Sequence, residues 1–197
     1  MVALQDDLGS RDRPAPVVGI VLVARGDERE APTEADVPQL ERLEVLLAGF
    51  GAGGCDTLYV ALGSRVIAAP RDTSTTFYLP SWYDGLDATV HAALTYARGL
   101  DPIAGVLLQT VDSADVGGVG VARVLAAAGR RRDAVVRGVR HGHWAQPVYV
   151  GADLLPDAAD LLAASGGAIG FLGDHAGEVT TVDCSDLAGP DVPGGLH

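Results

Sequence analysis

Short, predominantly apolar runs recur along this chain and alternate with segments of helical periodicity. The runs at 17–24, 56–63 and 104–112 have the length and composition of strands that are buried on both faces of a sheet. Buried strands that alternate with helices form a doubly wound, mostly parallel sheet. The sequence therefore predicts an α/β protein with a Rossmann-like, three-layer α/β/α arrangement in a single domain.

Helical periodicity fills most of the gaps between these strands. Helices are predicted over 36–50, 85–98, 116–128 and 152–164, with a further helical segment over 167–172. The glycine-rich sequence at 51–54 is expected to end the first helix, because glycine commonly follows a helix C-terminus. A short extended piece is predicted at 77–80.

The remaining segments complete the predicted domain. Strands at 133–139 and 146–151, separated by a short polar connection, are expected to form an antiparallel edge element. A last strand is predicted at 178–184. The polar, proline-containing residues 1–16 are expected to be a flexible tail, which leaves 17–197 as the domain.

Composition argues against several classes of partner. The net charge of -12 at pH 7 repels polyanions, which disfavours nucleic acid or an anionic membrane as a partner. No apolar segment approaches the ~20 residues that cross a bilayer, and the N-terminal residues lack the pattern of a secretory signal. We therefore expect a cytoplasmic protein whose two cysteines, Cys55 and Cys184, are buried thiols.

The end of the third strand is the first candidate site. Asp112 lies where the carboxyl end of a parallel strand meets its loop, which is where ligands bind in open α/β sheets. Together with Asp115 it could hold Mg²⁺ through carboxylate oxygens and so neutralise a triphosphate. Alternatively, Asp115 caps the helix that follows, and Asp112 or Ser113 forms an Asx-type turn. Both interpretations stay open at this point.

Two further polar clusters admit more than one role. His141 and His143 would point to the same side of an extended segment and could share a metal, but no third ligand is evident. A solvated loop, or a lip over a ligand with Trp144 as a stacking surface, is the alternative. The arginines at 130–132 follow a helix C-terminus, where cations complement the helix dipole. A solvated cluster is their simpler interpretation, and a phosphate site is the other.

Six segments, taken in chain order, carry a family resemblance: LVARGDERE at 22–30, WYDGLDATVHAAL at 82–94, TVDSAD at 110–115, HWAQPVYVG at 143–151, SGGAIGFL at 165–172 and DVP at 191–193. Together with the order of elements over 17–193, they resemble the MobA-like nucleotidyltransferases. That family attaches a nucleotide to molybdopterin or a related acceptor. The resemblance implies a Rossmann-like fold that binds a nucleoside triphosphate and a small-molecule acceptor.

In that family the first strand runs into a loop of the form L-A-A-G-x-S-x-R-M-G-x-x-K. Ala24, Gly26 and Arg29 match this loop, whereas Arg25 stands where a glycine belongs and the closing lysine is absent. The resemblance implies that the nucleotide binds over Ala24, Arg25, Gly26 and Arg29, with Arg29 also catalytic. Because the chain contains no lysine, cationic contacts to the phosphates have to come from arginine.

The other segments imply further site residues. Asp112 corresponds to the metal-binding aspartate that follows the family's third strand, which implies a catalytic and metal-binding role. Gly85 falls in the segment that contributes to the nucleotide site. His143, Gln146 and Pro147 fall near the acceptor site, with Gln146 where histidine is usual.

The last motif and the expected activity follow from the same resemblance. Asp191, in DVP at 191–193, is implied as a second metal ligand, although Pro193 replaces a further, metal-facing aspartate. Each lost electrostatic contact typically costs a few kcal/mol of transition-state stabilisation. The resemblance thus implies an Mg²⁺-dependent transfer of a nucleotide from a nucleoside triphosphate to a phosphorylated, molybdopterin-like acceptor, with weakened or altered activity. The alternative is a catalytically inactive nucleotide- or metabolite-binding protein that serves a protein partner or a regulatory role.

Overall fold

A computed structural model of the chain describes residues 14–23, 36–63, 69–79, 84, 86–100, 102–113, 116–164 and 179–187. The strands in these ranges are β1 (Val17–Val23), β2 (Thr57–Leu62), β3 (Thr75–Tyr78), β4 (Gly105–Thr110), β5 (Val135–Arg140), β6 (His143–Gly151) and β7 (Val179–Asp183). The helices are α1 (Asp36–Gly53), α2 (Leu86–Arg98), α3 (Gly117–Ala128) and α4 (Leu155–Ala164), with a 3₁₀ turn η2 (Ala152–Leu154) before α4.

These elements match the predicted ones closely. The extended piece predicted at 77–80 is strand β3, which begins and ends two residues earlier. The helical segment predicted over 167–172 lies outside the described residues, and so do residues 1–13 of the predicted tail. Within the described part of the chain, no helix has the length and apolar character needed to cross a membrane.

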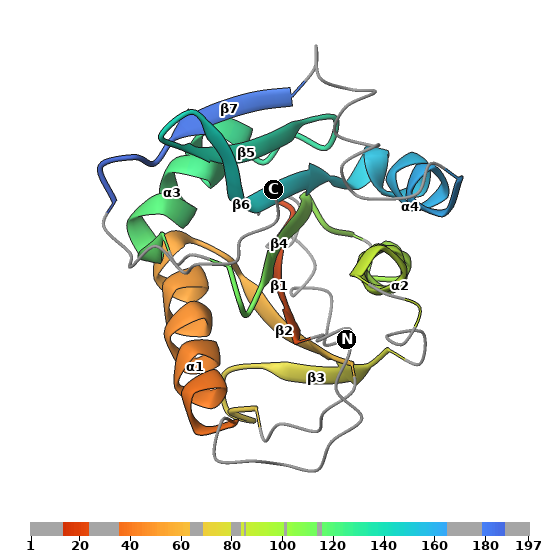
Figure 1. The fold of residues 1–197 in the computed structure, drawn as a ribbon. Helices are drawn as coiled ribbons and strands as arrows, with labels where there is room; N and C mark the ends of the chain where they lie inside the picture. Colours follow the sequence, from red (N-terminus) through yellow and green to blue (C-terminus); the bar gives the residue numbers. More distant parts are fainter. Residues whose placement is uncertain are drawn as a thin grey trace, which may run out of the picture.

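The strands form one sheet in the order β3-β2-β1-β4-β6-β5-β7 (Figure 1). Neighbouring strands are parallel except for β6, which runs antiparallel to both β4 and β5. The predicted α/β fold with a mostly parallel sheet and an antiparallel element is confirmed. The antiparallel strand lies inside the sheet, because β7 returns parallel to β5 and extends the sheet beyond the β5–β6 hairpin.

Helices cover both faces of the sheet and give it two cores. Helices α1 and α3 pack together on one face, and α2 and α4 pack together on the other (Figure 1). Every residue of β1 is buried, which explains its uninterrupted apolar run. Alternate residues of β1 serve the two cores: Val17, Val21 and Val23 under α1 and α3, and Val18, Ile20 and Leu22 under α2 and α4.

The glycine-rich sequence at 51–54 ends α1, as predicted, but the helix extends three residues beyond Phe50. It continues through Gly53, and of these glycines Gly54 takes a positive φ, of 111°. A Cβ at Gly53 would lie 2.9 Å from the carbonyl oxygen of Gly118 in α3. These glycines therefore allow close packing of α1 against α3, in addition to marking the end of the helix.

Candidate functional site

The strand order reverses between β1 and β4. From β1 the chain adds β2 and β3 on one side and then returns to add β4 on the other side. The backbone N–H of Val111 donates to the carbonyl oxygen of Leu22 (3.0 Å), so the carboxyl ends of β1 and β4 lie side by side. In open α/β sheets, ligands bind outside the carboxyl ends of strands at the point where the order reverses.

Asp112 lies at this point, in the turn that follows β4. It is half-buried. The carbonyl oxygen of Thr110 accepts hydrogen bonds from the N–H (3.1 Å) and the hydroxyl (2.8 Å) of Ser113. The hydroxyl of Ser113 therefore contributes a side-chain bond to this turn. Asp115 lies outside the described residues, and the N-cap residue of α3 is Val116, with no side-chain cap.

Gln146 and Pro147 lie next to the end of β4, in the strand that was expected to approach the acceptor. The backbone pairing of β4 with β6 extends as far as Leu108 and Val148. Beyond it, the side-chain Oε1 of Gln146 accepts a hydrogen bond from the N–H of Thr110 (2.6 Å). Pro147 is buried, follows a cis peptide bond and cannot donate to a ladder. Gln146 therefore has a structural role that the sequence did not predict, and its contact with an acceptor stays a prediction.

The two histidines lie at the tip of the β5–β6 hairpin. His141 and Gly142 form a two-residue turn with positive φ at both positions (50° and 80°), as in a type I′ turn. His143 is exposed and begins β6. A metal shared by both histidines on one extended segment is not supported, because His141 belongs to the turn, and the exposed turn agrees with the other interpretation, a solvated loop. Among the described residues, no group of three or more His, Cys, Asp or Glu side chains could hold a metal.

Sequence reasoning missed Arg137. This residue is on β5, only 6% exposed, and its guanidinium carbon lies 3.8 Å from the ring centroid of Trp144 on β6. Its Nε and Nη1 atoms are buried and find no hydrogen-bond partner among the described residues. Burial lowers the pKa of Arg137 to about 10. The signal in the sequence was the strand alternation, which places Arg137 on the same inward face as Val135.

Several predicted site residues fall outside the described residues, namely Ala24, Arg25, Gly26, Arg29, Gly85 and Asp191. The phosphate loop and the second metal ligand therefore stay predictions. Of the predicted metal ligands, Asp112 is the one that lies among the described residues, and its carboxylate suits Mg²⁺ or Mn²⁺, which favour oxygen ligands. In nucleotide sites Mg²⁺ is usually bound by one or two carboxylates together with substrate phosphates.

The arginines at 130–132 lie at the opposite, amino edge of the sheet. Arg130 donates to Asp56 (2.8 Å) and to the carbonyl oxygen of Ala15 (2.9 Å). Arg132 pairs with Asp153 (2.9 Å) and donates to the carbonyl oxygen of Ile103. These bonds tie strand ends and loops together, which supports the structural interpretation of this cluster over a phosphate site.

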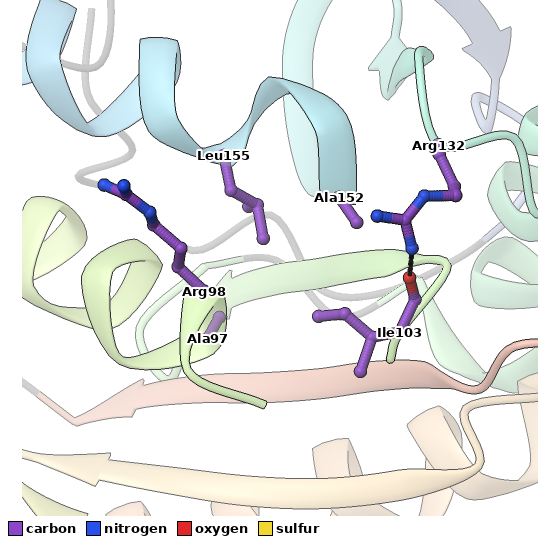
Figure 2. A pocket seen from close by; sticks show the side chains of 6 residues that line it. All are labelled: Ala97, Arg98, Ile103, Arg132, Ala152 and Leu155. Atoms are coloured by element: carbon purple, nitrogen blue, oxygen red, sulfur yellow. Dashed lines mark hydrogen bonds between the residues drawn. The ribbon is translucent and has the colours of Figure 1, made fainter. Parts of the chain in front are cut away.

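A shallow pocket of about 230 Å³ opens beside this cluster (Figure 2). It is lined by Ala97, Arg98, Ile103, Arg132, Ala152 and Leu155. Figure 2 shows the Arg132 guanidinium bonded to the Ile103 carbonyl at one end of the pocket. Apart from Arg132, none of the residues that the sequence analysis considered for a site lines this pocket, and it lies away from the carboxyl ends of β1 and β4.

No protein-family model matches this chain, and no curated protein matches it in sequence. Solved structures resemble its fold. One is Rv0371c from Mycobacterium tuberculosis H37Rv, with a TM-score of 0.63 and 22% identity over 87% of this chain and 89% of that chain. The same protein is also known in complex with manganese, and that structure gives a TM-score of 0.59 and 18% identity over 85% and 88% of the two chains.

Two further structural neighbours are named for an activity. The nucleotidyl transferase Mth528 from Methanothermobacter thermautotrophicus gives a TM-score of 0.64 and 17% identity over 85% of this chain and 87% of that chain. The 2-C-methyl-D-erythritol 4-phosphate cytidylyltransferase from Thermus thermophilus gives a TM-score of 0.56 and 17% identity over 88% of this chain and 92% of that chain. At such identities the likeness shows the fold alone. The chain has the fold that these nucleotidyl- and cytidylyltransferases share.

Proposed function

We propose that this protein transfers a nucleotide from a nucleoside triphosphate to a phosphorylated small molecule, with Asp112 as a ligand of a divalent metal. One observation carries the proposal. In a fold shared with nucleotidyl- and cytidylyltransferases, a half-buried carboxylate lies where the strand order reverses, beside the end of β1. Because such transfers use nucleoside triphosphates, we also place the protein in the cytoplasm.

Residues after β4 and residues after β1 would bind different parts of the metal–nucleotide complex. Asp112 would hold Mg²⁺ or Mn²⁺, with Asp191 as the second proposed ligand. The bound ion would neutralise charge on the triphosphate. Arg25, Arg29 and the backbone of the loop between them would contact the phosphates. An oxygen of the acceptor's phosphate attacks the α-phosphorus, the bond to the β-phosphate oxygen breaks, and pyrophosphate leaves.

The acceptor would lie on the β6 side of Asp112, near His143, Gln146 and Pro147. The bond that the side chain of Gln146 accepts from the N–H of Thr110 (2.6 Å) holds this part of β6 against the end of β4. A molybdopterin-like acceptor is the finer form of the proposal and rests on the resemblance to MobA-like proteins. We expect weak or altered activity, because Arg25 replaces a glycine in the loop and the chain contains no lysine.

Calorimetric titration tests the metal assignment. The wild-type protein is titrated with GTP, CTP and ATP, each with Mg²⁺, with Mn²⁺ and without metal. One nucleotide is expected to bind more tightly with metal, and Asp112→Asn is expected to weaken that metal-dependent binding by about tenfold or more, because it removes a charged oxygen ligand.

Asp133→Asn is the matched control. It makes the same chemical change at an exposed carboxylate that pairs with the exposed Arg131 (3.4 Å), away from the β1–β4 edge. It should leave nucleotide binding unchanged. Equal binding by wild type and Asp112→Asn would refute the metal assignment. No binding at millimolar nucleotide would favour the alternative, a protein that keeps this fold to serve a partner without catalysis.

A further inference from the structure

The inference starts from a buried cation that lacks hydrogen-bond partners. Arg137 lies in the middle of β5, where it pairs with Val148 on β6 and with Thr181 on β7. Its Nε and Nη1 atoms have no hydrogen-bond partner in the described part of the chain. A buried charge of this kind is costly unless something pairs with it. The remaining question is what the guanidinium binds.

The contact with Trp144 satisfies only one side of the guanidinium. An aromatic ring attracts the flat face of a guanidinium, whereas the N–H groups point outward in its plane. The stack at 3.8 Å therefore orients Arg137 and leaves its in-plane donors for an oxyanion. Trp144 is 51% exposed, so the guanidinium lies only one ring away from solvent.

The neighbouring carboxylate on the same side of the sheet is already engaged. Asp183, at the end of β7, is in register with Val139, two residues beyond Arg137. Its Oδ1 accepts hydrogen bonds from the N–H (2.9 Å) and the hydroxyl (2.5 Å) of Ser185, and these bonds lower its pKa. Since Nε and Nη1 of Arg137 find no hydrogen-bond partner among the described residues, Asp183 does not bond to either atom.

The position of this pair connects it to the proposed active site. Trp144 precedes Gln146 by two residues on β6, and Gln146 is bonded to Thr110, which precedes Asp112 by two residues. Strand β6, which carries Gln146, lies between β4 and β5, so the Arg137–Trp144 pair and Asp112 lie along the same carboxyl end of the sheet with Gln146 between them.

We propose that Arg137, held against Trp144, binds an oxyanion of the acceptor, a phosphate or a carboxylate. The identification of the bound molecule as the acceptor rests on the proposed function, whereas the anion site itself does not. The planar N–H groups of arginine match the two oxygens of either anion. The site sets which acceptors bind, because a molecule without an acidic group leaves the buried cation unpaired.

Tryptophan fluorescence can report on this site directly. The chain has two tryptophans, so Trp82→Phe leaves Trp144 as the only one. This variant is titrated with inorganic phosphate and, separately, with succinate, at constant ionic strength maintained with chloride. A saturable change in Trp144 emission is expected. A stronger response to phosphate indicates a phosphorylated acceptor group, and a stronger response to succinate indicates a carboxylated one.

Substitution of the arginine provides the decisive comparison. In the same background, Arg137→Met is expected to raise the Kd for the anion by about tenfold or more, and Arg137→Lys is expected to raise it less, because lysine keeps the charge without the planar donors. Arg98→Met is the matched control. It removes the same charge from an exposed arginine in the pocket at the opposite edge and should leave the titration unchanged.

Two further measurements separate this proposal from the proposed function. Asp112→Asn should keep the response of Trp144 to phosphate, and Arg137→Met should keep metal-dependent nucleotide binding. Arg137→Met should also melt no lower than wild type, because it removes a buried charge that lacks a partner. The anion site would be overturned if wild type and Arg137→Met bound the anion with the same Kd. It would also be overturned if Trp144 gave no response to anions in wild type and Arg137→Met had a lower Tm. Either result holds whatever the nucleotide titrations show.

Discussion

Burial changes the chemistry of individual side chains throughout this sheet. Desolvation raises the pKa of Cys55 to about 12 and that of Tyr149 to about 12, and it lowers the pKa of Arg137 to about 10. The Tyr149 hydroxyl donates to the carbonyl oxygen of Arg131 (3.0 Å), so its polar end is satisfied. Arg137 differs, because two of its donors have no such partner among the described residues.

The cysteines give a prediction at this scale. Cys55 and Cys184 are buried, free thiols with raised pKa values. At pH 8 both are expected to react far more slowly with a disulfide reagent in the native protein than in guanidinium, where two thiols per chain should appear. Equal native and unfolded rates would contradict the buried placement.

The same shift sets a pH dependence. Because folding raises the pKa of Cys55 from 9.0 to about 12, its contribution to stability is fully present below pH 9 and is lost as pH rises toward 12. Urea unfolding at pH 8 and pH 10.5 measures this loss. Cys55→Ala serves as the control. In this variant the loss of unfolding free energy between the two pH values should be smaller, because only the contribution of Cys55 is removed and that of Tyr149 remains.

At the scale of elements, close contacts between helices decide where small residues occur. Gly53 at the end of α1 lies against Val121 and the carbonyl oxygen of Gly118 in α3. Gly51, one half-turn earlier, is exposed, and a Cβ there would meet only the side chain of Leu58 at 3.8 Å. The two glycines have the same intrinsic helix propensity but opposite surroundings.

Alanine at these two positions should therefore act in opposite directions. Gly53→Ala is expected to destabilise the protein by about 1–3 kcal/mol, because α1 and α3 have to move apart. Gly51→Ala is expected to stabilise it by about 0.5–1 kcal/mol, because alanine restricts the unfolded chain and favours helix. Urea unfolding of both variants measures the difference, and a stabilising Gly53→Ala would show that the helices do not pack this closely.

Element positions could largely be predicted from the sequence, whereas the contacts between elements could not. The strands at β1, β2 and β4 follow from their buried apolar runs, because periodicity is a local property. The role of Gly53 depends on Gly118, which is 65 residues later in the chain. A rule that associates glycine with helix ends has no information on such a partner.

At the scale of the whole molecule, the carboxyl and amino ends of the strands carry different sets of side chains. The carboxyl edge holds Asp112 and the Arg137–Trp144 pair, whereas the amino edge is closed by structural ion pairs. Asp56 Oδ2 accepts from the N–H of Val17 (2.8 Å) as well as from Arg130 (2.8 Å). This arrangement ties the end of α3 to the starts of β1 and β2.

Two adjacent arginines test this division. Arg130→Met is expected to lower the free energy of unfolding by about 1–2 kcal/mol, because it removes partly buried, charge-assisted bonds. Arg131→Met is the matched control and should change stability by less than about 0.5 kcal/mol, since its pair with Asp133 is exposed. Chemical unfolding at low and high salt measures both, and equal effects would show that Arg130 does not close the edge.

The sequence by itself determined the α/β class, the buried parallel strands and the position of Asp112 after a strand, because each depends on patterns within about ten residues. Only the tertiary structure decided that β6 lies inside the sheet, that Gln146 bonds to Thr110 and that Arg137 lies on Trp144. The first two features depend on pairing between strands that are not adjacent in the sequence. The third depends on the shift in the β5–β6 pairing between Arg137 and Gly138. Register is set by packing and hydrogen bonding across the sheet, which local periodicity does not contain.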